Sequence, residues 1–164
     1  MGAVTYPNPQ VQQLIHDHFV AVKFNVAEPT PDFTEILRAS RPLWGPTFVF
    51  LDASKAELRR SVGYVPPADF MAELTLVLGL WDVLHAQPAE AFEHFHSVAR
   101  SEPAGKFTPE ALFWTGCAAY RREGPGKEKK LAALRPWWLE VMERFPESTW
   151  ADRASAILPL TDTQ

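Results

Sequence analysis

The spacing of apolar residues changes along the chain, with short mixed patterns in the first half and a steady helical period in the second. Residues 10–17 place Val11, Leu14 and Ile15 on one face, which predicts a short helix after a Pro-Asn-Pro turn. Residues 19–26, FVAVKFNV, alternate in character and are rich in β-branched and aromatic types, which predicts a β-strand.

The middle of the first half predicts a helix and a hairpin. Thr30 is suited to cap a helix and Pro31 to begin it, so we expect a helix over residues 31–39. The run TFVFLD, residues 47–52, is almost continuously apolar and predicts a buried strand. Turn residues follow, and the more polar run ELRRSVGY, residues 57–64, predicts the second strand of a hairpin at the sheet edge.

A long helix closes the first half. The run ADFMAELTLVLGLWDVL, residues 68–84, repeats its apolar positions with a helical period and predicts an amphipathic helix. The order helix, strand, helix, strand, strand, helix favours an α/β fold with helices on the faces of a sheet. We therefore predict a first domain over residues 1–84 and a small all-α helical-hairpin domain over residues 85–164.

Proline and turn residues divide the second domain into four predicted helices. The first two carry these apolar or small faces: Ala91, Phe92, Phe95, Val98 and Ala99, then Phe113, Gly116, Cys117 and Tyr120. The third covers about residues 129–144, and the fourth covers residues 149–158 with Ser148 as its N-cap. The placing of Gly116, Tyr120 and Pro146 resembles a tetratricopeptide helical hairpin. The long GPGKE loop and Pro136 both depart from that repeat. We therefore expect a small helical domain and not a free-standing array of helical repeats.

Charge and composition remove several classes of function. The 164 residues include 46% hydrophobic and 22% charged residues, which are ordinary values for a globular protein. With 16 basic against 20 acidic residues, the composition does not indicate a basic surface for nucleic acid or for an anionic membrane. No apolar stretch reaches the roughly 20 residues of a membrane span.

Cysteine usage points to a reducing compartment. The single residue Cys117 cannot form an internal disulfide, so we expect a cytoplasmic protein. The start MGAVTYPNPQ has no basic segment followed by an apolar run, and therefore predicts no secretory signal. Both expectations hold only if translation begins at Met1.

Residues 1 to about 82 resemble a thioredoxin-like domain. The resemblance lies in the helix and strand between Val11 and Phe24, in Gly45-Pro46-Thr47 leading directly into FVFLD, and in the Gly63-Tyr64 pair before a closing amphipathic helix. It implies that Pro46 is the cis-proline of the family, which presents backbone to an extended substrate. The candidate peptide-binding residues are therefore Trp44, Gly45, Pro46 and Thr47, although Trp44 could equally be a hydrophobic plug over an absent active site.

The departure from the family is as informative as the resemblance. Members carry Cys-x-x-Cys at the start of their first helix, preceded by a strand, and here both would fall before Met1. The missing strand would lie between the strands expected over residues 19–26 and 47–52, which leaves an incomplete thioredoxin-like sheet. Those two strands could pair directly, a partner or second copy could donate a strand, or the native product could start upstream. We predict that the isolated chain self-associates through this sheet.

Other candidate sites have ordinary structural explanations. Cys117 follows Gly116 on a helix face with Phe113 and Tyr120, so we interpret it as a small buried residue and not a reactive thiol. His94 and His96 point to different helix faces, and His16 and His18 lack a third ligand, so no metal site is predicted. The chain has no glycine-rich phosphate loop and no Gly-x-Ser-x-Gly elbow, and we expect no cofactor.

Two functions remain from the sequence. The first is a thioredoxin-fold protein without a redox cysteine pair that binds or assembles proteins or peptides, with the tetratricopeptide-like tail as a second interaction surface. The second is a thiol-disulfide oxidoreductase whose Cys-x-x-Cys lies upstream of a misassigned start.

Overall fold

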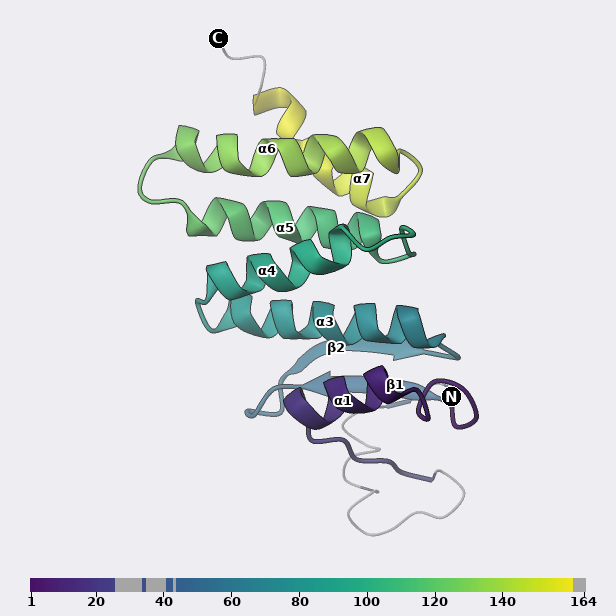
Figure 1. Ribbon diagram of the computed structural model, residues 1–164. Helices are drawn as coiled ribbons and strands as arrows, with labels where there is room; N and C mark the ends of the chain where they lie inside the picture. The colour runs from purple at the N-terminus through teal and green to yellow at the C-terminus, as the bar shows by residue number, and fades with distance from the viewer. Residues whose placement is uncertain (26–33, 35–40, 43, 161–164) are drawn as a thin grey trace. The chain divides into compact units, whose positions relative to one another are not determined.

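The computed structural model describes residues 1–25, 34, 41–42 and 44–160 (Figure 1). The described elements combine helices with a small antiparallel sheet, which makes the fold broadly α/β as predicted. The contacts divide the chain into two compact units, Met1–Leu74 and Thr75–Gln164. This division falls inside a helix and not after residue 84, and the predicted domain boundary stays a prediction. The elements, in order, are α1 (Pro9–His18), β1 (Thr47–Leu51), β2 (Glu57–Val62), α3 (Pro67–Leu84), α4 (Pro88–Ala99), α5 (Thr108–Arg122), α6 (Lys127–Arg144), α7 (Thr149–Ala154) and the 3-10 helix η1 (Ser155–Leu160).

The predicted short helix is confirmed as α1. Its start is fixed by Asn8, whose side-chain oxygen accepts hydrogen bonds from the backbone N–H groups of Gln10 at 3.0 Å and Val11 at 3.2 Å. Capping of this kind satisfies donors that the first helical turn leaves without partners. Val11 is completely buried and directs the apolar face of α1 into the core of the first unit.

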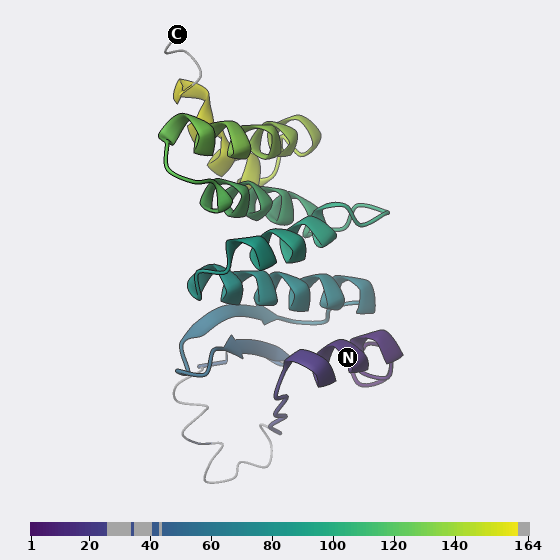
Figure 2. The same cartoon turned by 60° about the vertical axis from the view of Figure 1, so that its left-hand side comes forward.

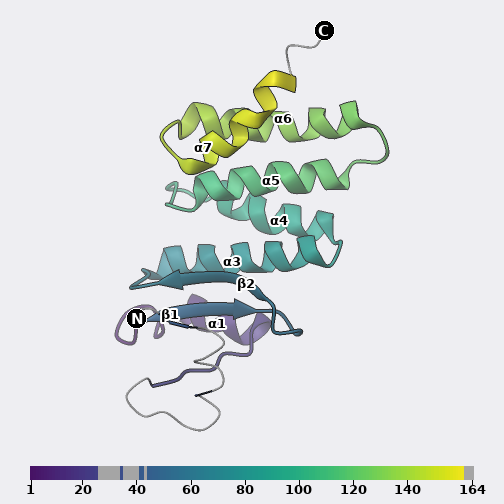
Figure 3. The same ribbon diagram turned by 180° about the vertical axis from the view of Figure 1, so that it is seen from behind.

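The predicted hairpin is confirmed as β1 and β2, which pair antiparallel with Thr47 opposite Val62 and Val49 opposite Arg60. Figure 3 shows the two arrows running in opposite directions. The prediction that the first strand is buried was wrong, because every residue from Thr47 to Phe50 is only partly buried and Leu51 is exposed. A central strand would have neighbours on both sides, whereas the sheet has two strands in the described residues.

The strand predicted over residues 19–26 was wrong for residues 19–25, and residue 26 lies outside the described chain. No residue of this segment belongs to a strand, although Phe19 still contacts Phe50 edge to face at 6.3 Å. Val20 is 96% exposed and Val22 is 68% exposed. The alternating pattern expresses a preference for extended backbone, but a strand also needs a hydrogen-bonded neighbour. The helix predicted over residues 31–39 lies outside the described residues apart from Thr34.

The core of the first unit lies between α1, one face of the hairpin and the start of α3. Its fully buried members are Val11, Val65, Phe70 and Leu74, and partly buried neighbours include Leu14, Ile15, Phe48 and Phe50. Thr5 is also buried, and its hydroxyl donates a 2.7 Å hydrogen bond to the carbonyl of Val65. The N-terminal turn is therefore part of this core.

The second unit is helical, as predicted. Neighbouring helices α4, α5 and α6 lie side by side, with α7 beside α5 and α6 (Figure 2). Close packing requires two glycines, since a Cβ at Gly79 would come within 2.5 Å of Phe95 and one at Gly116 within 2.8 Å of Trp138. Ser148 caps α7 as predicted and accepts a hydrogen bond from the N–H of Ala151 at 3.1 Å.

Two details of the helical unit differ from the predicted boundaries. The helix α6 begins at Lys127, two residues before the predicted start, and it accommodates Pro136 in its interior. The last predicted helix is α-helical only to Ala154 and continues as η1. In the part of the chain that the structure describes, no helix is both long enough and apolar enough to cross a bilayer.

Candidate functional site

The four candidate residues form a turn at the start of β1. The Gly45–Pro46 peptide bond is cis, which confirms the conformation that the resemblance implied. The hydroxyl of Thr47 donates a hydrogen bond to the carbonyl of Trp44, and the carbonyl of Pro46 accepts one from Gly63 N–H at 2.8 Å. The first bond closes the turn on itself, and the second joins the turn to Gly63, just after β2.

This turn presents its residues to solvent. Trp44 is 75% exposed, and Gly45 and Pro46 are exposed beside it. A Cβ built at Gly45 would meet no atom within 4 Å, so space is open around the backbone there. Both roles predicted for Trp44, a contact for a bound peptide and a hydrophobic plug over an absent active site, stay predictions. The four candidate residues are consecutive in the chain, and their role as a peptide-binding site also stays a prediction.

The direction of the main-chain groups in β1 follows from the turn. Because Gly63 N–H bonds to the Pro46 carbonyl, Pro46 and Gly63 occupy a hydrogen-bonded position of the ladder. Such positions alternate along an antiparallel pair. Phe48 and Phe50 therefore point their N–H and C=O groups toward β2, whereas Thr47 and Val49 point theirs to the other edge.

The two edges of this hairpin differ in charge. Strand β1, TFVFL, has no charged residue, whereas β2, ELRRSV, has three. Arg60 Nη2 lies 2.5 Å from Glu57 Oε2, and the hydrogen bond from Arg60 lowers the pKa of the Glu57 carboxyl. Charged side chains on an edge strand discourage the addition of another strand. The edge of β1 lacks this protection and, in the described residues, has no strand beside it.

A buried carboxylate fixes the hairpin to the start of α3. Glu73 is 1% exposed, and Arg59 Nε donates to its Oε1 at 3.0 Å. Ser61 Oγ donates to the second oxygen, Oε2, at 3.1 Å. Both carboxylate oxygens are thereby bonded, as a buried charge requires. The β2 strand is held in place on its covered face, so the edge of β1 is presented on a rigid support.

The second unit contains a separate pair of titratable groups. His94 Nδ1 lies 2.7 Å from Asp82 Oδ2, and Asp82 is 5% exposed. His96 instead stacks on Phe92 at 5.4 Å between ring centroids, so the two histidines face different neighbours as the helical spacing predicts. Among the described residues, no group of three or more potential metal ligands exists.

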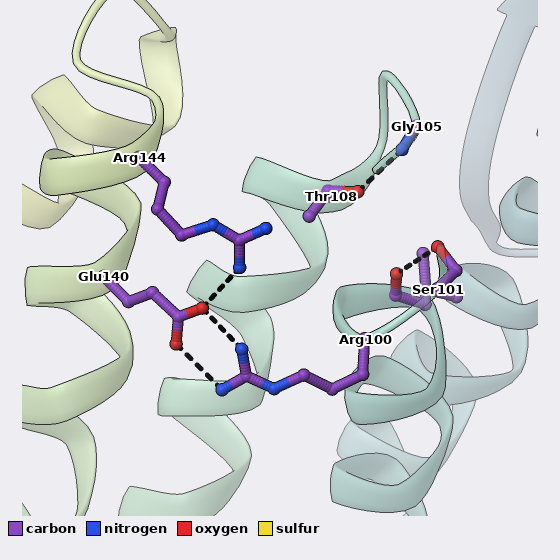
Figure 4. A network of polar contacts seen from close by, with 7 residues as sticks. Arg100, Ser101, Gly105, Thr108, Glu140 and Arg144 are labelled. Carbon is purple, nitrogen blue, oxygen red and sulfur yellow. Dashed lines mark hydrogen bonds and ion pairs between the residues drawn. The ribbon is translucent and has the colours of Figure 1, made fainter. Parts of the chain in front are cut away.

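A second polar network joins α4 to α6 (Figure 4). Arg100 binds Glu140 through both guanidinium Nη atoms, at 2.5 and 2.8 Å, and Arg144 donates to Glu140 Oε1 at 2.5 Å. These hydrogen bonds, mainly those from Arg100, lower the pKa of Glu140. Nearby, the N–H of Gly105 donates to the Thr108 hydroxyl at 3.0 Å, close to the start of α5.

The only cysteine, Cys117, does not supply a thiolate. It lies in the second unit, and burial raises the pKa of its thiol to about 12. The thiol is therefore protonated at neutral pH, and thiol exchange, which requires the thiolate, is suppressed. This agrees with the interpretation of Cys117 as a packing residue.

Sequence reasoning missed Glu73, Asp82 and Glu140. A signal existed for the first two, because they are the only acidic residues in the apolar stretch from Phe70 to Leu84. An isolated charge in such a run indicates a specific buried partner. No such signal marks Glu140, which lies on a polar helix.

No family model matches the chain, and neither the curated proteins nor the solved structures include one significantly similar to it.

Proposed function

We propose that the first unit is a thioredoxin-like domain without a redox cysteine pair and that it binds extended protein or peptide segments along β1. The bound segment adds as a strand beside the turn formed by Trp44, Gly45, Pro46 and Thr47. The observation that carries this proposal is the uncharged edge of β1, with no strand beside it in the described residues. In strand addition, main-chain hydrogen bonds supply affinity and side-chain contacts supply selectivity.

The chemistry of the edge supports binding that depends little on peptide sequence. Thr47 and Val49 each offer an outward N–H and C=O, and each bond contributes a net stabilisation of roughly 0.5–1.5 kcal/mol. The exposed indole of Trp44 adds an apolar contact at one end. After the cost of association, we expect a Kd roughly between 10 and 500 µM.

Self-association belongs to the same proposal. Without a peptide, the β1 edges of two copies pair antiparallel, which makes a symmetric contact in which the same surface is used twice. The tetratricopeptide-like helical unit offers a second surface for protein partners. The lone protonated thiol fits a reducing compartment such as the cytoplasm.

The test measures binding of a fluorescently labelled octapeptide by fluorescence polarisation. The peptide alternates threonine and valine and contains one lysine. Its control has the same side chains but N-methyl groups on alternate residues, which removes the main-chain donors on one edge. We expect the unmethylated peptide to bind and the methylated peptide to bind at least about tenfold more weakly. Equal binding of the two peptides contradicts the proposal.

A matched pair of variants locates the site. Val49→Pro removes an outward donor from β1, and Arg60→Pro removes one from the facing position on β2. We expect Val49→Pro to lose peptide binding and self-association, measured by sedimentation, while Arg60→Pro retains both. Circular dichroism confirms that each variant is folded. Loss of binding in Arg60→Pro alone would place the site on the other edge.

A further inference from the structure

A pocket of about 610 Å³ that is widely open to solvent, called the cavity below, lies in the second unit between α5, α6 and η1. Its lining residues are Cys117, Tyr120, Arg121, Leu131, Leu134, Trp138, Ala156 and Ile157. A volume of this size falls within the roughly 300–1,000 Å³ of small-molecule sites. The cavity belongs to the helical unit alone, so an inference from it is independent of the function proposed for β1.

The interior of this cavity is apolar and uncharged. Leu134 and Ile157 are buried, and the indole N–H of Trp138 already donates to the carbonyl of Phe113 at 3.1 Å. Burial raises the pKa of the Cys117 thiol to about 12, so this group is neutral as well. A ligand portion inside the cavity gains by removing apolar surface from water and finds no charged partner there.

The single charged lining residue is Arg121, which is exposed. It makes no ion pair with any other residue in the described part of the chain. A second cation stands nearby, because Lys130 Nζ lies 5.4 Å from the ring centroid of Tyr120. No carboxylate lines the cavity. The positive mouth contrasts with the net charge of −4 for the whole chain.

We propose that this cavity binds small apolar monocarboxylates, with the hydrocarbon part inside and the carboxylate on the guanidinium of Arg121. A guanidinium pairs with a carboxylate through two parallel hydrogen bonds, which favours this head group over a neutral one. The apolar wall offers the ligand no set of hydrogen-bond donors and acceptors. The length and shape of the ligand's hydrocarbon part therefore decide the fit more than its polar groups do. The ligand class is therefore defined by one negative charge next to a compact apolar body.

Arg122 provides a matched control for Arg121. Its guanidinium lies 4.5 Å from the ring centroid of Phe92, and it does not line the cavity. Ala156 provides a way to fill the site, because it lines the cavity and is exposed, so a larger side chain there does not disturb buried packing. The variants Arg121→Gln, Arg122→Gln and Ala156→Trp thus separate charge at the mouth, charge elsewhere and occupancy of the cavity.

The experiment is isothermal titration calorimetry of the full chain with decanoate, decanol and decyltrimethylammonium, each below its micelle concentration. We expect saturable one-to-one binding of decanoate, with decanol and the cation at least about tenfold weaker. Arg121→Gln lowers decanoate affinity by about tenfold or more, Arg122→Gln leaves it unchanged, and Ala156→Trp abolishes it. Circular dichroism checks that every variant is folded.

A second readout places the ligand in the cavity. Residue-resolved amide NMR of the isotope-labelled chain follows Leu134 and Ile157, which line the cavity. We expect saturating decanoate to shift the signals of both residues in the wild type and to leave them unchanged in Ala156→Trp. The proposal is overturned if decanoate does not bind saturably, if decanol binds equally well, if Arg121→Gln binds as the wild type does, or if decanoate leaves the signals of Leu134 and Ile157 unchanged.

Discussion

The two units satisfy their backbone hydrogen bonds in different ways. In the second unit, α4, α5 and α6 pair their N–H and C=O groups internally, and Phe95, Leu112 and Val141 lie in the core with 0% exposure. In the first unit, β1 and β2 satisfy each other on one side only within the described residues. Helices are complete by themselves, whereas strands need neighbours. Among the described residues, the sheet unit is therefore the part whose backbone still offers hydrogen bonds to a partner.

Truncating one core side chain in each unit should give the largest stability difference between the two units. Phe95→Ala removes a fully buried ring from the helical unit and should destabilise it by about 3–5 kcal/mol. Phe48→Ala removes a partly buried ring from the sheet unit and should cost less, about 1–3 kcal/mol. Urea unfolding gives the magnitudes, and hydrogen exchange locates the affected unit. Equal losses would mean that the cores of the two units are equally well packed.

A smaller effect should distinguish the buried ion pair of the sheet unit from the exposed one. Glu73→Gln removes the buried carboxylate that accepts a hydrogen bond from Arg59, whose side chain is 15% exposed, and we expect a loss of roughly 2–3 kcal/mol. The control Glu57→Gln removes a pair whose side chains are 41% and 29% exposed, and it should leave urea stability unchanged within error. If both variants behave alike, Glu73 does not anchor the hairpin.

The ion-pair network around Glu140 in the helical unit should show the weakest effect, with a defined pH dependence. Glu140→Gln removes the carboxylate that Arg100 and Arg144 share, and the expected loss is about 0.5–1 kcal/mol because these side chains are partly solvated. The pKa of Glu140 is lowered by folding, so its contribution is present above the ordinary value of 4.5 and disappears as the pH falls through the lowered value. Urea titrations at pH 7 and pH 3 measure this. A difference between wild type and variant that is as large at pH 3 as at pH 7 would contradict the assignment.

The helices were predicted well because their signals are local. Apolar spacing and caps such as Ser148 fixed most helix positions to within a few residues, and the turn before β1 was predicted from neighbouring residues. The strand over residues 19–25 failed because alternation in Phe19–Phe24 reports a preference for extended backbone and cannot report whether a neighbour exists. The predicted burial of β1 failed for the same reason.

The polar contacts and the cavity depend on distant parts of the chain. Glu73 meets Arg59 from 14 residues away, and Glu140 meets Arg100 from 40 residues away, so no local pattern specifies either pair. The cavity beside Arg121 is formed by side chains of three separate segments, α5, α6 and η1, and no prediction from the sequence pointed to it. Contacts of this kind can be identified only once the three-dimensional arrangement of the helices and strands is known.

The most direct test of the open β1 edge is residue-resolved amide hydrogen exchange, at low protein concentration, with and without the threonine–valine octapeptide. The account predicts slow exchange for the inward N–H groups of Phe48 and Phe50 in both conditions. The outward N–H of Val49 should exchange at nearly the unprotected rate alone and become protected when the peptide is added. A Val49 amide that is already protected in the free monomer, or that stays fast at saturating peptide, would contradict the account.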